Sequence, residues 1–219
     1  MSTLSRRTMM MGVPLFIAGC ATSQQQTSLV AAQPFDSGVN AADYGSMADE
    51  PYPVRAVNLA RLDPDLLRQE VAYNGPCAPG TIIVDIPGRR LYLIQPGGLA
   101  VRYGVGVGRE EALNFRGSAV ISRKAEWPTW TPTESMMQSL PRYRAYAGGM
   151  PGGAENPLGA RALYLYRGNE DTHFRLHGTT EPQSIGKAVS SGCIRLFNQD
   201  IIDLYRRVPI GTELIVMQA

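Results

Sequence analysis

The stretch TIIVDIPGRRLYLIQPGGLAVRYGVGVG, residues 81–108, decides the fold class of this chain. Its apolar, β-branched and aromatic residues fall in three short runs, 81–86, 91–95 and 99–108, separated by the turn sequences PGRR and PGG. Runs of this kind, joined by short Gly- and Pro-containing turns, predict the strands of a sheet. The glycines of the third run alternate with apolar residues, so we expect this strand to cross close under another backbone segment.

The same pattern continues toward the C-terminus. We expect further strands at 118–127, 161–168, 172–178 and 213–217. Two short helices are expected, one over 62–71 begun by Asp63 and one over 198–208 capped by Asn198. The Pro- and Gly-rich stretches 126–136 and 145–159 read as long surface loops of the kind that line binding sites. These observations predict a mainly β domain with a few short helices.

Composition and charge predict a single domain and argue against a nucleic-acid-binding protein. The chain has 219 residues, 44% of them hydrophobic, which is enough for one domain with a core. Its formal net charge of +2 is small, and the Arg-Arg pairs at 89–90 and 206–207 do not extend into basic runs. Binding to nucleic acid is therefore not expected.

The first twenty residues are typical of a bacterial export signal. Two arginines, Arg6 and Arg7, precede a short apolar run that ends in small residues before Cys20. SRRTMM resembles a twin-arginine signal, and IAGC resembles a lipobox whose cysteine carries the lipid. A plain cleaved signal with an incidental cysteine is the alternative. We expect a periplasmic lipoprotein anchored to a membrane, with the outer membrane preferred because Ala21 rather than aspartate follows Cys20.

The sequence then divides into three parts. Residues 21–53 are rich in Gln, Ser and Ala and are expected to form a flexible tether. Residues 54–79 are expected to be a short helical lead-in, and residues 80–219 the folded domain.

The candidate chemistry lies in HGTTEPQSIGKAVSSGCIRL, residues 177–196. A thiol at neutral pH is mostly protonated, so Cys193 needs a base such as His177 to become a good nucleophile. Gly192 permits a tight turn before the cysteine, and the N–H groups of Gly192 and Cys193 are candidate oxyanion donors. A cysteine, a histidine and such a turn are the parts that acyl transfer through a thioester requires.

The motif RLHGTTEP followed by IGKAVSSGCIRLFNQDIIDLY resembles the signature of the L,D-transpeptidase (YkuD-type) catalytic domain, over about residues 81–217. The resemblance implies a YkuD-like β-sandwich or barrel-like sheet. It also implies Cys193 as nucleophile, His177 as proton donor and acceptor, and Gly178 as the residue whose carbonyl orients the histidine. Gly192 would be an oxyanion donor and Arg195 a structural or substrate-binding group. The family usually has histidine where this chain has Ser191, which we expect to contact substrate.

What the resemblance implies for function is a peptidoglycan L,D-transpeptidase. Cys193 would attack the amide between the L-centre of diaminopimelate and D-alanine in a tetrapeptide stem. The acyl group would then pass to an amine, giving a 3→3 cross-link or attachment of a cell-wall-linked protein. No cofactor or metal is implied. The alternatives are a carboxypeptidase or amidase that uses water, and a lipoprotein that binds peptidoglycan without catalysis.

Three other readings of the candidate residues stay open. Cys193 and Cys77 form an even pair once Cys20 is assigned to lipid, so a disulfide is the competing role for Cys193. His173 lies four residues before His177, on the same face of a regular strand, and could assist the site. Trp127 and Trp130 either flank the substrate cleft or serve in ordinary packing.

Overall fold

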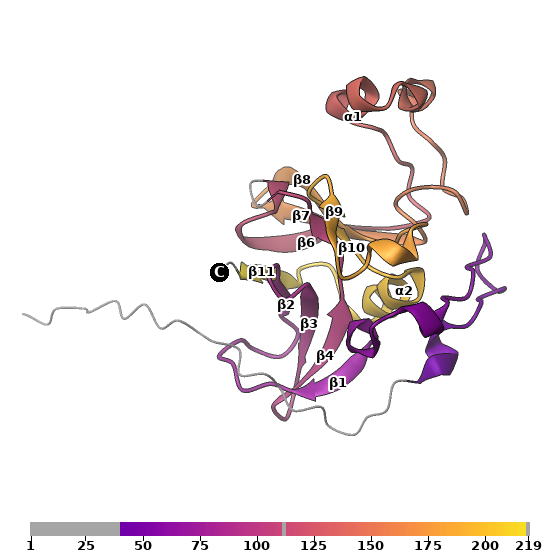
Figure 1. The fold of residues 1–219 in the computed structure, drawn as a ribbon. Coiled ribbons are helices and arrows are strands. Elements are labelled where there is room, and N and C mark those ends of the chain that lie inside the picture. The colour runs from indigo at the N-terminus through magenta and orange to yellow at the C-terminus, as the bar shows by residue number, and fades with distance from the viewer. Residues whose placement is uncertain (1–39, 111–112, 218–219) are drawn as a thin grey trace, which may run out of the picture.

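The computed structural model describes residues 40–110 and 113–217. Within these residues the main element is one sheet of nine strands (Figure 1). In spatial order they are β1 (Gln69–Ala72), β4 (Leu99–Gly104), β3 (Arg90–Gln95), β2 (Ile82–Asp85), β11 (Glu213–Met217), β6 (Gly117–Glu126), β7 (Arg161–Arg167), β8 (Glu170–His177) and β10 (Ile194–Arg195). A two-stranded sheet joins β5 (Val107–Gly108) to β9 (Ala188–Ser190).

Every segment that the sequence predicts as a strand contains one. The third run of the opening stretch is divided into β4 and β5. Neighbouring strands of the large sheet are antiparallel except for two parallel pairs, β2 with β11 and β8 with β10. The first strand of the opening stretch therefore lies at the centre of the sheet, beside the last strand of the chain.

The sheet curls around a single large core and nearly closes on itself. Buried residues from strands near both of its edges, including Val101 of β4 and Ile194 of β10, belong to one hydrophobic cluster. Beyond β4, the Gly106 N–H donates to the Arg195 carbonyl (2.9 Å) and the Arg195 N–H to the Gly106 carbonyl (2.8 Å). Figure 1 shows β6–β8 above and β1–β4 below, with β11 between them. The expected mainly β, barrel-like architecture is confirmed.

The glycines after β3 allow the close crossing that the sequence predicts. A Cβ atom on Gly104 would lie 2.3 Å from the Leu66 carbonyl oxygen, and one on Gly106 would lie 2.7 Å from the Ser184 carbonyl oxygen. Both distances are shorter than a Cβ contact tolerates. These two positions therefore need glycine because other backbone segments pass directly over them.

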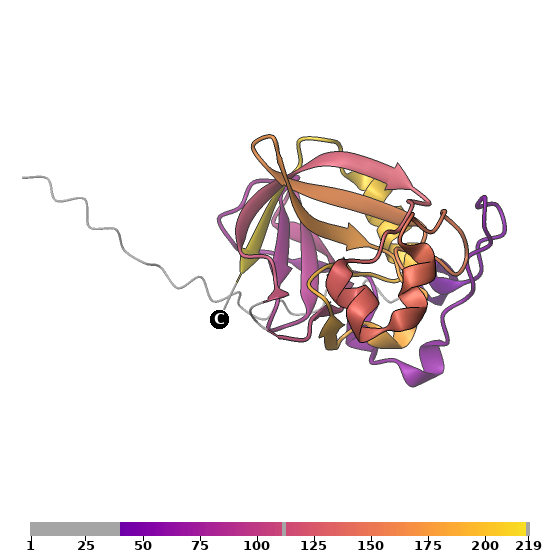
Figure 2. The ribbon, with the colours of Figure 1, turned by 90° about the horizontal axis from the view of Figure 1, so that it is seen from above.

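The helices cover the sheet sparingly. Helix α2 (Asn198–Arg207) packs on β7 and β8 and buries Ile201, Ile202 and Leu204. Between β6 and β7 the chain makes an excursion that contains α1 (Glu134–Ser139) and the 3-10 helix η5 (Pro141–Tyr146). The excursion stands away from the sheet in Figure 1, and Figure 2 looks down on it from above. None of the helices in the described residues is long and apolar enough to cross a bilayer.

Two helix predictions need correction. The helix expected over 62–71 is only a 3-10 turn, η3 (Pro64–Leu66), followed by strand β1. Asp63 does cap this turn, because its side chain accepts from the Asp65 N–H at 3.0 Å. The second helix exists, but its N-cap position is Phe197 and not Asn198. The Asn198 side chain instead bonds to the Ala160 N–H and the Thr179 carbonyl.

The segment from 40 to 53 is packed against the domain, which corrects the predicted tether over these residues. It includes the 3-10 helix η1 (Ala41–Tyr44), and the ring of Tyr44 is 2% exposed. Glu50 forms a buried ion pair with Arg161 (2.8 Å) and accepts from the Trp127 indole (3.1 Å). Two further 3-10 helices, η2 (Leu59–Arg61) and η3, precede β1. Residues 1–39, with the predicted signal, Cys20 and the rest of the tether, lie outside the described residues.

A buried polar cluster fastens this segment to α2. The Tyr44 hydroxyl donates to both Asp200 carboxylate oxygens (3.0 and 3.2 Å) and accepts from the Arg68 N–H (2.5 Å). The Arg68 guanidinium lies 3.6 Å from Asp200 and 3.4 Å from Asp203. Burial, with Asp203 and Asp43 nearby, raises the pKa of Asp200 to about 7, although Arg68 and the Tyr44 hydroxyl oppose this shift. The cluster therefore depends on the tyrosine as well as on the arginine.

Replacing Tyr44 with alanine should destabilise the whole domain, because it removes a buried ring and leaves the Asp200 carboxylate without its hydroxyl donor. We expect a loss of about 3–5 kcal/mol in the free energy of unfolding, measured by urea denaturation. Tyr52→Ala, in the same segment but 41% exposed, is the matched control and should cost less than about 1 kcal/mol. Equal values for the two variants would contradict the packing of residues 40–53.

Candidate active site

His177 is the last residue of β8 and is held by the sheet. It pairs with Ala162 of β7 on one side and Arg195 of β10 on the other, and it is 5% exposed. Its Nδ1 atom lies 2.6 Å from the carbonyl oxygen of Gly178. A carbonyl only accepts hydrogen bonds, so Nδ1 carries the proton and the lone pair of the imidazole is on Nε2.

Burial also sets the charge of this imidazole. It lowers the pKa of His177 from 6.5 to about 4; the Gly178 carbonyl opposes this shift, and the nearby Arg195 and Arg175 add to it. At neutral pH the ring is therefore uncharged and able to accept a proton at Nε2.

Asn198 fixes the loop that carries Gly178. Its Oδ1 accepts from the Ala160 N–H and its Nδ2 donates to the Thr179 carbonyl, both at 3.0 Å. A Cβ atom on Gly178 would lie 2.1 Å from this Oδ1, so only glycine fits beneath the asparagine. Asn198 was missed as a site residue because asparagine before an apolar helix face is also typical of a cap.

Cys193 stands at the end of a tight turn, directly before β10. The Ser190 hydroxyl shapes this turn by accepting from the Gly192 N–H (3.1 Å) and donating to the Cys193 carbonyl (2.7 Å). Gly192 has a φ of 128°, which residues with a Cβ rarely adopt. The half-buried thiol donates to the carbonyl oxygen of His173 at 3.9 Å. The parallel pairing of β10 with β8 thus brings the cysteine to the strand that ends in His177.

The turn bears on one predicted role. Gly192 is expected to offer its N–H to an oxyanion, and in this structure that N–H donates to Ser190 Oγ, so its role as an oxyanion donor stays a prediction. Ser190, which sequence reasoning passed over in favour of Ser191, is therefore the residue that preorganises the turn. Its burial distinguishes Ser190 from Ser191, and burial cannot be predicted from two adjacent serines in the sequence.

The thiol is protonated in the resting site. Burial raises the pKa of the Cys193 thiol, while the Arg175 N–H, the Arg175 guanidinium and Arg195 lower it. A protonated thiol and a neutral imidazole are the states from which a base could take the proton as a sulfur attacks.

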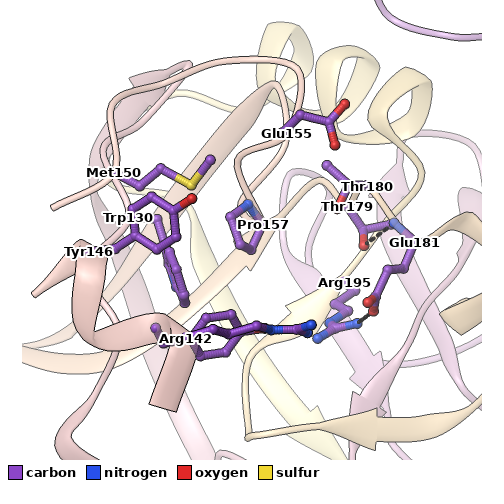
Figure 3. Close-up of a pocket in the computed structure, with 11 residues that line it drawn as sticks. Trp130, Arg142, Tyr146, Met150, Glu155, Pro157, Thr179, Thr180, Glu181 and Arg195 are labelled. Carbon is purple, nitrogen blue, oxygen red and sulfur yellow. Dashed lines mark hydrogen bonds and ion pairs between the residues drawn. The ribbon is translucent and has the colours of Figure 1, made fainter. Parts of the chain in front are cut away.

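A pocket of about 340 Å³ lies next to the segments that follow His177 and Cys193, although neither of these two residues lines it. Thr179 and Arg195, two residues beyond His177 and Cys193, lie on one side of it, and Arg142 and Tyr146 of the excursion lie on the other. Figure 3 shows Arg142 pointing toward Arg195, which is itself paired with Glu181 at 2.7 Å. Trp130 packs edge-on against Tyr143 and also lines the pocket. The pocket thus offers aromatic surface and two guanidinium groups.

The remaining predicted residues occupy different places. Ser191 is exposed, and its hydroxyl lies 3.5 Å from Arg109. Trp127 does not line the pocket and instead bonds to Glu50. The His173 side chain is exposed, because a positive φ of 62° breaks the alternation that would have placed it on the face of His177.

The disulfide reading of Cys193 is not supported. Cys77 and Cys193 are both free thiols, and Cys77 packs in a separate cluster with Val71, Tyr73 and Ile83.

Comparison with known proteins identifies the family of the chain. The family model of the L,D-transpeptidase catalytic domain, YkuD, matches residues 79–216, which is more than half of the chain. The chain therefore belongs to this family, and the resemblance seen in the sequence is confirmed.

Curated relatives carry the same family name. The chain is 37% identical over 144 residues to the probable L,D-transpeptidase ErfK/SrfK and 35% identical over 141 residues to the probable L,D-transpeptidase YbiS, both from Escherichia coli K12. Each match covers 61% of this chain, but only 42% and 43% of the relatives. The chain thus spans less than half the length of these two proteins.

A crystal structure from Brucella melitensis, described as a probable carnitine operon oxidoreductase, is 46% identical to this chain. It covers 73% of this chain and 99% of its own, with a TM-score of 0.49. A superposition of this quality carries no argument about activity.

The neutral state of His177 can be measured directly, because the chain has only two histidines. In an NMR titration of the untagged protein, the His177 ring should change protonation near pH 4, so that it is still neutral at pH 5.5. Assignment by His173→Asn identifies the signal. A midpoint at or above 6.5 would show that the imidazole is not desolvated and would contradict the general-base state.

Proposed function

We propose that this protein is a peptidoglycan L,D-transpeptidase with Cys193 as nucleophile and His177 as the proton acceptor and donor. The proposal rests on the parallel pairing of β8 with β10. Because of this pairing, Cys193, directly before β10, lies beside the strand that ends in His177, whose imidazole is neutral and oriented by Gly178. Membership of the L,D-transpeptidase family supports the same reaction class.

Acylation follows from these groups. As the Cys193 sulfur attacks the carbonyl carbon of the amide between the L-centre of diaminopimelate and D-alanine, His177 Nε2 takes the thiol proton. The carbon–nitrogen bond then breaks, and the amine of D-alanine leaves with the proton from the imidazolium. A thioester between the stem peptide and Cys193 remains, and the imidazole is neutral again.

Transfer repeats these steps in reverse. An acceptor amine attacks the thioester carbonyl while Nε2 takes its proton, and the proton then returns to the leaving thiolate. The product is an amide, either a 3→3 cross-link between two stems or a bond to a cell-wall-linked protein. We assign oxyanion stabilisation to the Cys193 N–H, because the Gly192 N–H is engaged by Ser190.

The pocket suits a peptide that carries carboxylates. Arg142 and Arg195 face the same space, and planar guanidinium groups bind carboxylates in a bidentate manner. The aromatic side chains of Trp130, Tyr143 and Tyr146 offer surface for the apolar parts of a stem peptide. We propose that this pocket holds one of the two stems, with Ser191 at the rim of the site.

We also propose a periplasmic location with a lipid anchor at Cys20, on the outer membrane in preference to the inner. The twin-arginine-like and lipobox-like sequences support this. Between Cys20 and the first described residue, Asn40, a fully extended chain would reach at most roughly 70 Å. Such a reach would let an anchored domain act on peptidoglycan near the membrane.

Incubation with purified tetrapeptide muropeptides tests the activity. We expect cross-linked dimers and free D-alanine from the wild type, no product from Cys193→Ala, and a loss of about 10²–10⁴-fold in rate for His177→Ala. Ser191→Ala is the matched control and should change the rate less than about tenfold. Liquid chromatography with mass spectrometry resolves the products.

The other outcomes of this experiment decide against the proposal. Trimmed monomers without dimers would show water as the acceptor, that is, a carboxypeptidase. Unchanged muropeptides in the presence of bound protein would indicate a non-catalytic peptidoglycan-binding lipoprotein. A larger loss for Ser191→Ala than for His177→Ala would overturn the assignment of the base.

A further inference from the structure

Strand β8 is irregular at His173, close to the catalytic cysteine. The φ of 62° at this residue lies in the left-handed region, and the register between β7 and β8 shifts between Tyr164 and Tyr166. The chain therefore makes a bulge, which turns the His173 side chain to solvent and brings its carbonyl oxygen to 3.9 Å from the Cys193 sulfur. The bulge forms one wall of the thiol site.

The carboxylate of Asp171 holds this bulge together. Its Oδ1 atom accepts from the His173 N–H at 2.8 Å. Both of its oxygens also pair with the guanidinium of Arg175, at 2.8 and 2.9 Å. A bidentate pair of this kind fixes the orientation of both side chains. The carboxylate therefore ties the strained residue and the arginine that follows it into one unit.

Arg175 is held from two further directions. Its Nη1 atom donates to the Phe174 carbonyl at 2.9 Å, and its guanidinium lies 4.3 Å from the centre of the Tyr164 ring. Only 15% of the side chain is exposed. The cation is thus stacked on an aromatic ring and paired with a carboxylate, in a partly desolvated position where its charge acts strongly on neighbours.

The fixed arginine acts on both reactive groups. Against the effect of burial, the backbone N–H of Arg175, by a hydrogen bond, and the charge of its guanidinium both lower the pKa of the Cys193 thiol. The same positive charge, adding to burial, lowers the pKa of His177 and keeps the imidazole a free base. Arg175 therefore favours the anionic sulfur while leaving Nε2 open for the thiol proton.

We propose that Arg175 is a positioning residue of this site: locked by Asp171 and Tyr164, it seats the Cys193 sulfur against the β8 bulge and stabilises the thiolate as its proton leaves. This inference rests on the proposed function for the identity of the reaction. Its test measures the reactivity of the Cys193 thiol, so the role of Arg175 and the transpeptidase function can be rejected separately.

The charged groups around the sulfur come from three parts of the fold. Asp171 and Arg175 lie on β8, Arg195 lies on β10, and Arg109 approaches the neighbouring Ser191 from the segment after β5. The titratable His177 at the end of β8 is uncharged at neutral pH. Only Arg175 is changed in the test. Arg123 of β6 offers a matched control, because its guanidinium lies on the same Tyr164 ring at the same 4.3 Å, whereas the Asp171 pair in the described residues is made with Arg175.

The experiment measures the rate of iodoacetamide alkylation of Cys193 in the full domain from pH 5 to 10, with the modified peptide identified by mass spectrometry. Arg175→Met should shift the profile to higher pH by about one unit, which is about a tenfold slower reaction at pH 7. Arg175→Lys keeps the charge and should restore most of the shift. Arg123→Met should leave the profile unchanged.

Folding is checked by near-ultraviolet circular dichroism, and Arg175→Gln, which keeps a polar planar group for Asp171, replaces Arg175→Met if the latter does not fold. A wild-type profile in the neutral Arg175 variant, or an equal shift in Arg123→Met, would overturn the proposal. A shifted profile in a protein that makes no cross-links would uphold the role of Arg175 and reject the transpeptidase function.

Discussion

The two-residue strand β10 is the constraint on which the rest of the structure depends. It pairs in parallel with the end of β8 on one side, and on the other Arg195 exchanges two hydrogen bonds with Gly106. These contacts close the curled sheet and, in the same step, set Cys193 directly before the strand that adjoins His177. The same contacts therefore close the sheet and assemble the candidate site.

The surroundings of β10 are built from rigid backbone and short polar side chains. Asn198 holds the loop after His177, Ser190 holds the turn before Cys193, and Asp171 holds the bulge opposite the sulfur. Each of them hydrogen-bonds to backbone groups of the segment that it holds. The packed segment from 40 to 53 adds support from behind, because its Tyr44 contacts Asp200 in the first turn of α2, two residues after Asn198. The thiol and imidazole of the candidate site are thus supported by groups to which no step of the proposed reaction is assigned.

The sequence predicts the sheet well because alternating apolar runs with Gly-Pro turns carry strong local signals. It also singles out His177 and Cys193 as candidates, since the chain has only two histidines and three cysteines. It does not reveal β1, β9 and β10, which are two to four residues long and are stabilised by tertiary pairing. The packing of Tyr44 and Glu50 was missed because polar, low-complexity surroundings resemble a tether. Likewise, Ser190 and Asp171 gain their roles only when the turn and the bulge have formed, and no local pattern distinguishes them from surface residues.

The most direct measurement is the mass of the protein during turnover. The wild type mixed with a tetrapeptide stem and quenched with acid should gain the mass of the stem less D-alanine, and peptide mapping should place the adduct on Cys193. Cys193→Ala should show no adduct, and addition of an acceptor amine should discharge it. A protein that releases product without this adduct, or that carries it on another residue, would contradict the account.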